Sequence, residues 1–173
     1  THDDDLDELQ QLVDECHRAS SKGEIAGVVT VDDESKPPVT GIRGASVVHL
    51  RRNAGPARAR NAGRRAASTP FVAFVDSDVS LPEGWLDGLL AHFDDDTVAL
   101  VAPRVLSDPT SSSPVSRYET VHSPLDLGPI PGRIAPGARI AYVPAAMVVV
   151  RAAALDEIGG FDESMRVGED VDA

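Results

Sequence analysis

Apolar residues occur along the chain in two patterns, short continuous runs and recurrences every three or four residues. The runs predict β-strands, and the recurrences predict amphipathic α-helices. Strands are predicted over residues 25–31, 45–50, 71–75 and 98–102, with one or two more over 140–150. Helices are predicted over about residues 3–20, from Gly55-Pro56 onward, after the capping box that begins at Ser80, and over 152–158. Because strands and helices alternate, the predicted fold is α/β, with a doubly wound, mostly parallel sheet.

The chain has 173 residues and is predicted to form a single domain over residues 1–173. Residues 106–136 are rich in Ser, Pro and Gly and are predicted to be mostly loop, with a short helix around 115–121. The chain starts in a helix, whereas doubly wound sheets usually start with a strand, and it stops after GEDVDA. We therefore expect a fragment of a longer chain that lacks a first strand and a C-terminal part.

Apolar run length bears on membrane segments, and cysteine content bears on the compartment. The longest apolar run, residues 140–150, is far shorter than the roughly 18 to 20 residues that cross a bilayer, so no membrane segment is predicted in this fragment. The single Cys16 cannot form an intrachain disulfide, and no Cys/His pairs have zinc spacing. This usage is typical of a reducing compartment, and the predicted localisation is cytoplasmic.

The charge of the chain is unevenly distributed. The net charge of −12 argues against nucleic-acid binding. Residues 35–75, however, contain no Asp or Glu and carry eight basic residues. We expect part of this segment to meet a small anion, and we assign that role to Arg58 and Arg60. Arg64 and Arg65 are interpreted as the solvated face of a helix.

Four acids follow two of the predicted strands, namely Asp32, Asp33, Asp76 and Asp78. In parallel α/β sheets, ligands bind beyond the carboxyl ends of the strands. On an extended segment Asp76 and Asp78 project from the same side, where they repel unless a cation or hydrogen-bond donors lie between them. Mg²⁺ or Mn²⁺ suits such carboxylates and completes its shell with water and phosphate oxygens. The pattern predicts a nucleotide-diphosphate site, with Asp32 or Asp33 accepting a hydrogen bond from a base or ribose.

Two alternatives for the Asp76–Asp78 pair remain open. Asp and Ser are common turn residues, so DSD also fits a polar turn before Ser80. A D-x-D after a strand also occurs in Mg²⁺-dependent phosphohydrolases of the haloacid-dehalogenase type, where the first Asp is a nucleophile. Those enzymes need a downstream Lys, and this chain has none after Lys36. The phosphohydrolase is therefore the less favoured reading.

The motifs VVTVDDES, RNAGPARARNAG, FVAFVDSD, GGFDE and GED occur in this order. Together they resemble the family-2 nucleotide-sugar glycosyltransferases of GT-A fold, over about residues 25–173. The resemblance implies that Asp32 or Asp33 contacts uracil and that Asp76 contacts ribose. It also implies that Asp78 ligates the metal bridging the diphosphate, and that Arg60 lies beside the nucleotide.

On the acceptor side, the resemblance makes Asp170 of the ED dipeptide the catalytic base. Asp170 lies among Glu169 and Asp172, where repulsion between carboxylates can raise its proton affinity. The same acids also fit a solvated helix start. The acceptor side is expected to include Gly160, Phe161, Asp162 and Glu169, although the sequence alone would make the two glycines a helix stop and Phe161 a core residue.

The runs VDSDVSLPEGWLDGLLAHF and RIAYVPAAMVVV show a narrower resemblance, to the glycosyltransferases of the mycofactocin system. Such enzymes attach glucose units to a redox cofactor derived from a ribosomal peptide. The resemblance implies direct, inverting transfer from UDP-glucose to an acceptor hydroxyl, with the peptide-derived cofactor as acceptor. The non-enzymic alternative is a GT-A-like nucleotide-binding module without turnover.

Overall fold

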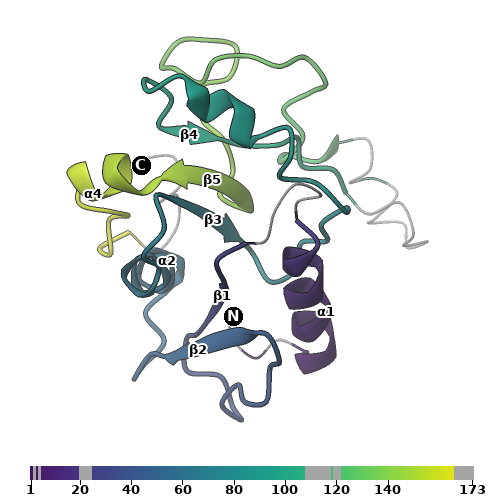
Figure 1. Cartoon of the computed structure of the whole chain (residues 1–173), viewed down its shortest axis with the longest axis vertical. Coiled ribbons are helices and arrows are strands. Elements are labelled where there is room, and N and C mark those ends of the chain that lie inside the picture. Colours follow the sequence, from purple (N-terminus) through teal and green to yellow (C-terminus); the bar gives the residue numbers. More distant parts are fainter. Residues whose placement is uncertain (2, 4, 20–24, 108–117, 119–121, 166–173) are drawn as a thin grey trace.

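The structure, a computed structural model, describes residues 1, 3, 5–19, 25–107, 118 and 122–165 (Figure 1). The described helices are α1 (Leu6–His17), α2 (Pro56–Ala66), the short 3₁₀ helix η1 (Leu90–Asp94) and α4 (Ala152–Glu157). The described strands are β1 (Val28–Asp32), β2 (Ala45–His49), β3 (Phe71–Val75), β4 (Leu100–Val101) and β5 (Met147–Arg151). The helix predicted around residues 115–121 lies outside the described residues, apart from Tyr118.

Local sequence sets where the two long helices begin. The Asp5 carboxylate accepts hydrogen bonds from the amides of Asp7 and Glu8, which caps the first turn of α1. Helix α2 begins at Pro56, as predicted, because proline suits the first helical position. Gly55 precedes it with φ of 84°, a backbone conformation that glycine adopts without strain.

Within the described residues the strands form two sheets. β1 and β2 are parallel, with Val28 opposite Ala45 and Asp32 opposite His49. In the other sheet β5 lies between β3 and β4 and is antiparallel to both, so β3 and β4 run in the same direction. The prediction of an α/β fold with a parallel sheet is confirmed, and β5 is the antiparallel exception. Two neighbouring strands are parallel when a crossover helix links them. A long connection over residues 102–146 precedes β5 instead, so the parallel direction is not imposed on this strand.

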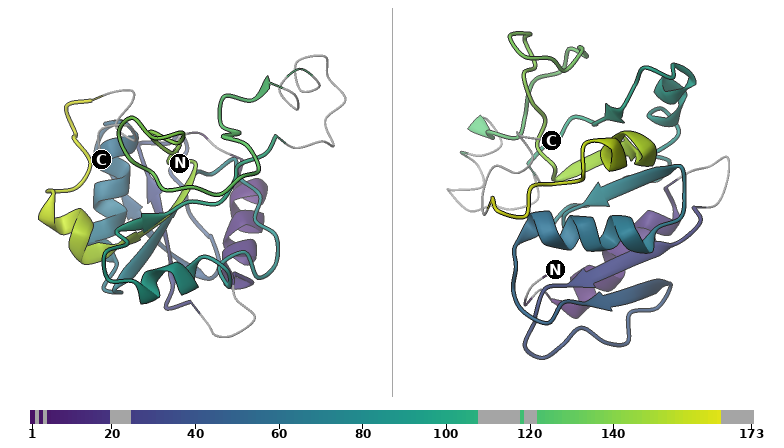
Figure 2. Two further views of the ribbon diagram at one scale, coloured as in Figure 1. Left: turned by 90° about the horizontal axis from the view of Figure 1, so that it is seen from above. Right: turned by 90° about the vertical axis from the view of Figure 1, so that its left-hand side faces the viewer.

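Strand β5 is the centre of the hydrophobic core. Its residues alternate between two clusters, and Met147 and Val149 are only 2% and 1% exposed. Val148 and Val150 pack with α2 and α4, while Met147 and Val149 pack with α1 and η1. Helices therefore cover both faces of this sheet (Figure 2). This layering is the doubly wound arrangement that the sequence predicts.

The helix predicted after Ser80 is replaced by turns and η1. Two amides of the predicted helix bind instead to α1 and to the segment just after it: Leu81 N–H donates to Glu15 Oε2 at 2.8 Å, and Leu86 N–H donates to the Ala19 carbonyl at 2.9 Å. Gly84, with φ of 71°, interrupts the segment further. The apolar residues still pack on the core, Leu81 among them. Tertiary hydrogen bonds thus override a local helix signal.

Across the described residues, no helix combines the length and the apolar character that crossing a membrane requires.

Candidate active site

Asp32 lies at the carboxyl end of β1 and is 2% exposed. Its Oδ1 accepts a hydrogen bond from the Ser35 amide, and its Oδ2 accepts one from the Val39 amide, at 2.9 and 3.1 Å. His49 Nδ1, at the end of β2, lies 2.9 Å from the same Oδ2. The carboxylate therefore ties the loop after β1 to the end of β2.

The environment of Asp32 favours its charged form. Burial alone acts to raise the pKa of this carboxyl. The hydrogen bonds from Ser35, His49 and Val39 outweigh burial and hold the pKa of Asp32 well below its usual value. Asp32 is therefore a carboxylate throughout the neutral range.

Asp33 binds the backbone just before α2. Its carboxylate accepts hydrogen bonds from the amides of Ala54 and Gly55, both at 2.9 Å. It is 5% exposed. The structure thus places both acids of the early strand at the expected sheet edge, with oxygens bound to backbone amides. Which of the two contacts a base stays a prediction.

At the end of β3, Asp76 pairs with Arg60 of α2. Arg60 Nη2 donates to Asp76 Oδ1 at 2.9 Å, and the Arg60 side chain is only 12% exposed. The guanidinium also lies over the Phe161 ring, 5.7 Å from its centroid. This ion pair joins the segment after β3 to α2.

Asp78 lies on a turn rather than on the extended segment that the sequence argument assumed. The Val79 amide donates to the Asp76 carbonyl at 3.2 Å, which closes the turn. Asp78 is exposed, and the Asp76 side chain, although paired with Arg60, is still 42% exposed. Asp78 is therefore the more exposed residue of the pair.

Within the described ranges no three His, Cys, Asp or Glu side chains are grouped closely enough to hold a metal by themselves. Mg²⁺ and Mn²⁺ do not require such a group when a substrate supplies phosphate oxygens, because one or two carboxylates and water complete the shell. The exposed carboxylate of Asp78 fits this kind of site.

Asn61 of α2 fastens the turn that follows α4. Its Oδ1 accepts a hydrogen bond from the Phe161 amide at 2.9 Å, and its Nδ2 donates to the Phe161 carbonyl at 2.8 Å. Nδ2 also donates to Glu163 Oε1 at 3.1 Å. Sequence reasoning missed Asn61. The available signal was an Asn inside a helix, where its side chain weakens the helix unless it binds elsewhere.

The residues predicted for the acceptor side differ in their exposure to solvent, and some lie outside the described residues. Phe161 is buried and its ring meets that of Phe74 edge-on, with centroids 5.3 Å apart. Asp162 is exposed, and hydrogen bonds from the backbone and side chain of Ser164 lower the pKa of its carboxyl. Gly160 lies against Asn61. Glu169 and Asp170 lie outside the described residues.

The glycosyl transferase family 2 matches residues 3–159 of the chain. The chain belongs to this family. Two pre-mycofactocin glycosyltransferases of Mycobacterium tuberculosis, from strains CDC 1551 / Oshkosh and ATCC 25618 / H37Rv, are each 50% identical to it over 151 residues. The matched region is 84% of this chain, but only 32% of the length of these curated relatives.

Solved structures show the same fold. S. aureus TarS in complex with UDP has a TM-score of 0.70 at 22% identity, over 99% of this chain and 51% of that chain. The mannosyltransferase PcManGT from Pyrobaculum calidifontis, in complex with GDP-Man and Mn²⁺, has a TM-score of 0.65 at 20% identity, over 98% of this chain and 47% of that chain. The fold of this chain is therefore that of the GT-A glycosyltransferases.

Replacing Asp32 with Asn is expected to lower the free energy of unfolding at pH 7, by about 1.5–3 kcal/mol, because hydrogen bonds to a charged group are lost. The folded pKa lies below the unfolded one, so the contribution is present above the unfolded pKa of about 3.9 and is lost as the pH falls towards the folded pKa. Urea unfolding at pH 7, 4 and 3 should show the difference from wild type shrinking with acid. The exposed Asp94→Asn is the control, and a pH-independent difference would contradict the argument.

Gly160→Ala is expected to destabilise the protein more than Gly159→Ala. Both glycines have positive φ, 84° and 87°, where a side chain costs about 1–2 kcal/mol. A Cβ at position 160 would also lie 2.6 Å from Asn61 Oδ1, whereas one at 159 meets nothing within 4 Å. Thermal unfolding measures both variants, and equal losses would mean that the Asn61 contact is not tight.

Proposed function

We propose that this chain is the catalytic domain of an inverting, metal-dependent glycosyltransferase. It transfers glucose from UDP-glucose to a hydroxyl group of a peptide-derived redox cofactor precursor. The observation that carries the proposal is the Arg60–Asp76 ion pair next to the exposed Asp78, at the carboxyl end of β3. Nucleotide ligands bind at this end of the strands in α/β folds.

The comparisons support separate parts of this proposal. Family 2 membership supports sugar transfer. The UDP in TarS and the GDP-Man and Mn²⁺ in PcManGT support a nucleotide-sugar donor and a divalent metal. The pre-mycofactocin glycosyltransferases, at 50% identity, support the acceptor class.

On the donor side, Asp76 accepts a hydrogen bond from the ribose, while Arg60 keeps that carboxylate oriented and lies beside the nucleotide. Asp32 or Asp33 accepts one from uracil. Asp78 holds Mn²⁺ or Mg²⁺ together with diphosphate oxygens. A metal held by Asp78 would supply positive charge that offsets the negative charge of the departing diphosphate.

On the acceptor side, Asp170 takes the proton of the attacking hydroxyl group. The acceptor oxygen forms a bond to the anomeric carbon of glucose. The bond between this carbon and the diphosphate oxygen breaks on the opposite face, and its electron pair leaves with UDP. Attack and departure on opposite faces invert the anomeric configuration. We assign Gly160, Phe161, Asp162 and Glu169 to this side.

Asp78→Ala is expected to weaken UDP binding in the presence of Mn²⁺ by about tenfold or more, because the metal loses a charged ligand. Calorimetric titration with UDP, with and without Mn²⁺, measures this loss. Asp96→Ala removes an acid that is 99% exposed and serves as the control. Wild-type binding of UDP that is indifferent to Mn²⁺ would count against the metal site.

Asp170→Asn is expected to lower the release of UDP from UDP-glucose by about 10²–10⁴-fold, the usual contribution of a general base, with UDP affinity unchanged. Asp172→Asn, a change of the same kind two residues away, should keep its turnover. If both variants lose turnover equally, Asp170 is not the specific base. If the wild type binds UDP without ever releasing it from UDP-glucose, the chain is a binding module.

A further inference from the structure

The side-chain amide of Asn61 on α2 is devoted to one turn, residues 160–163. Asn61 is only 7% exposed. Its Oδ1 accepts a hydrogen bond from the Phe161 amide at 2.9 Å. Its Nδ2, which carries two N–H groups, donates to the Phe161 carbonyl at 2.8 Å and to Glu163 Oε1 at 3.1 Å. Both backbone polar groups of Phe161 are thus bound by one side chain of a distant helix.

The turn has little room to shift against Asn61. A Cβ at position 160 would lie 2.6 Å from Asn61 Oδ1, so the backbone at Gly160 approaches the amide closely. The buried ring of Phe161 meets that of Phe74 edge-on, with centroids 5.3 Å apart. The Asn61 amide and the packing of Phe161 together fix where the turn lies on α2.

Helix α2 also carries contacts of the proposed donor side. Arg60, the residue before Asn61, pairs with Asp76 at the end of β3. The Arg60 guanidinium lies over the Phe161 ring, 5.7 Å from its centroid. Adjacent side chains of one helix therefore bind the donor-side acid and the turn. A shift of the turn would change its distance from the Arg60–Asp76 pair.

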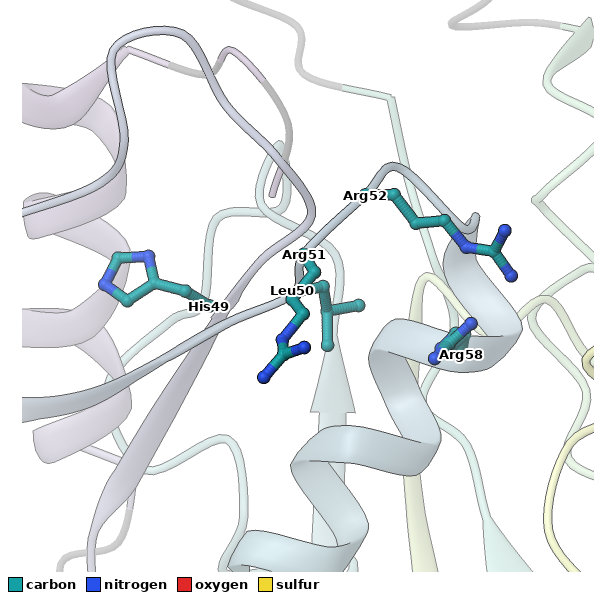
Figure 3. Close-up of a pocket in the computed structure, with 5 residues that line it drawn as sticks. All are labelled: His49, Leu50, Arg51, Arg52 and Arg58. Atoms are coloured by element: carbon teal, nitrogen blue, oxygen red, sulfur yellow. The ribbon is translucent and has the colours of Figure 1, made fainter.

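The start of α2 is close to the same two parts of the site. A pocket of about 470 Å³ at the end of β2 adjoins the proposed donor side, because its lining residue His49 has Nδ1 2.9 Å from Asp32 Oδ2. Arg58 of α2 also lines this pocket (Figure 3). Its Nε lies 3.9 Å from Glu163 Oε2. Helix α2 thus lies next to the donor-side pocket and the turn.

We propose that Asn61 is a positioning residue for sugar transfer. It holds the turn at a fixed place relative to Arg60 and Asp76, so that the acceptor hydroxyl group and the anomeric carbon of the donor meet in line. Asn61 acts through Phe161 and not by contact with either substrate. This inference rests on the proposed function, which assigns the donor to Asp76 and the acceptor side to the turn. A misplacement of about 1 Å can lower the rate of such a reaction by about 100-fold.

Asn61→Ala is expected to lower the release of UDP from UDP-glucose, with water as the acceptor, by about 10–100-fold. Its affinity for UDP with Mn²⁺ should stay at the wild-type value, because Arg60 and Asp76 are intact. A purely structural role would weaken UDP binding as well, since Arg60 lies on the same helix. Turnover assays and calorimetric titration measure the two quantities, at a temperature at which thermal unfolding shows the variant to be folded.

The matched control is Arg64→Ala. Arg64 anchors the same helix to α4 through Asp156, and the hydrogen bonds of its side chain go to Asp156 and Ala67, not to the turn. Arg64→Ala should keep its turnover. Equal loss of turnover in both variants, or wild-type turnover in Asn61→Ala, would overturn the positioning role alone. A wild type that binds UDP but never releases it from UDP-glucose would contradict the proposed function, and the positioning role would fall with it.

A second pair of variants decides the case in which Asn61→Ala does not fold. Gly160→Ala places a methyl group against Asn61 Oδ1, whereas Gly159→Ala places one where nothing lies within 4 Å. Gly160→Ala is expected to release UDP at least about tenfold more slowly than Gly159→Ala, with the same affinity for UDP. Equal turnover of the two glycine variants would overturn the proposal.

Discussion

Helix α2 is held by polar contacts to three segments that lie far from one another in the sequence. Asp33 binds the amides at its start, Asp76 pairs with Arg60, and the amide of Asn61 fastens Phe161. Most of these groups are partly or fully buried, where an unmade hydrogen bond is costly. These contacts fix the position of α2. They also fix the positions of Asp33 and Asp76 relative to the helix.

The four strand-end acids divide into two kinds. Asp32 and Asp33 are almost fully buried and serve the backbone of neighbouring loops. Asp76 and Asp78 lie at a turn, and Asp78 reaches solvent. Buried carboxylates that accept hydrogen bonds from amides fix the conformation of the neighbouring loops. An exposed carboxylate has oxygens that can still bind a ligand such as a metal ion. One sheet edge thus combines buried carboxylates that fix the neighbouring loops with a carboxylate that is exposed.

Much of this arrangement follows from sequence pattern. The third strand was predicted at residues 71–75 and is observed there, and α2 starts at Pro56 as expected, because apolar runs and proline are strong local signals. The prediction of a helix after Ser80 is wrong, because Glu15 and Ala19, which lie far away in the sequence, accept hydrogen bonds from amides of this segment. Asn61 was missed for the same reason, because its partner is 100 residues away. The cytoplasmic localisation and the roles of individual site residues stay predictions.

Strand β5 lies between β3 and β4 but follows both in the chain. During synthesis the ribosome must add the residues between Val75 and Met147 before the two earlier strands can be joined, which takes several seconds at about 5–20 residues per second. For that interval the hydrogen-bonding edge of β3, and that of β4 once it has been made, lacks its central neighbour. The nascent chain is then exposed to aggregation, and chaperones that shield apolar segments would have their main task in this window.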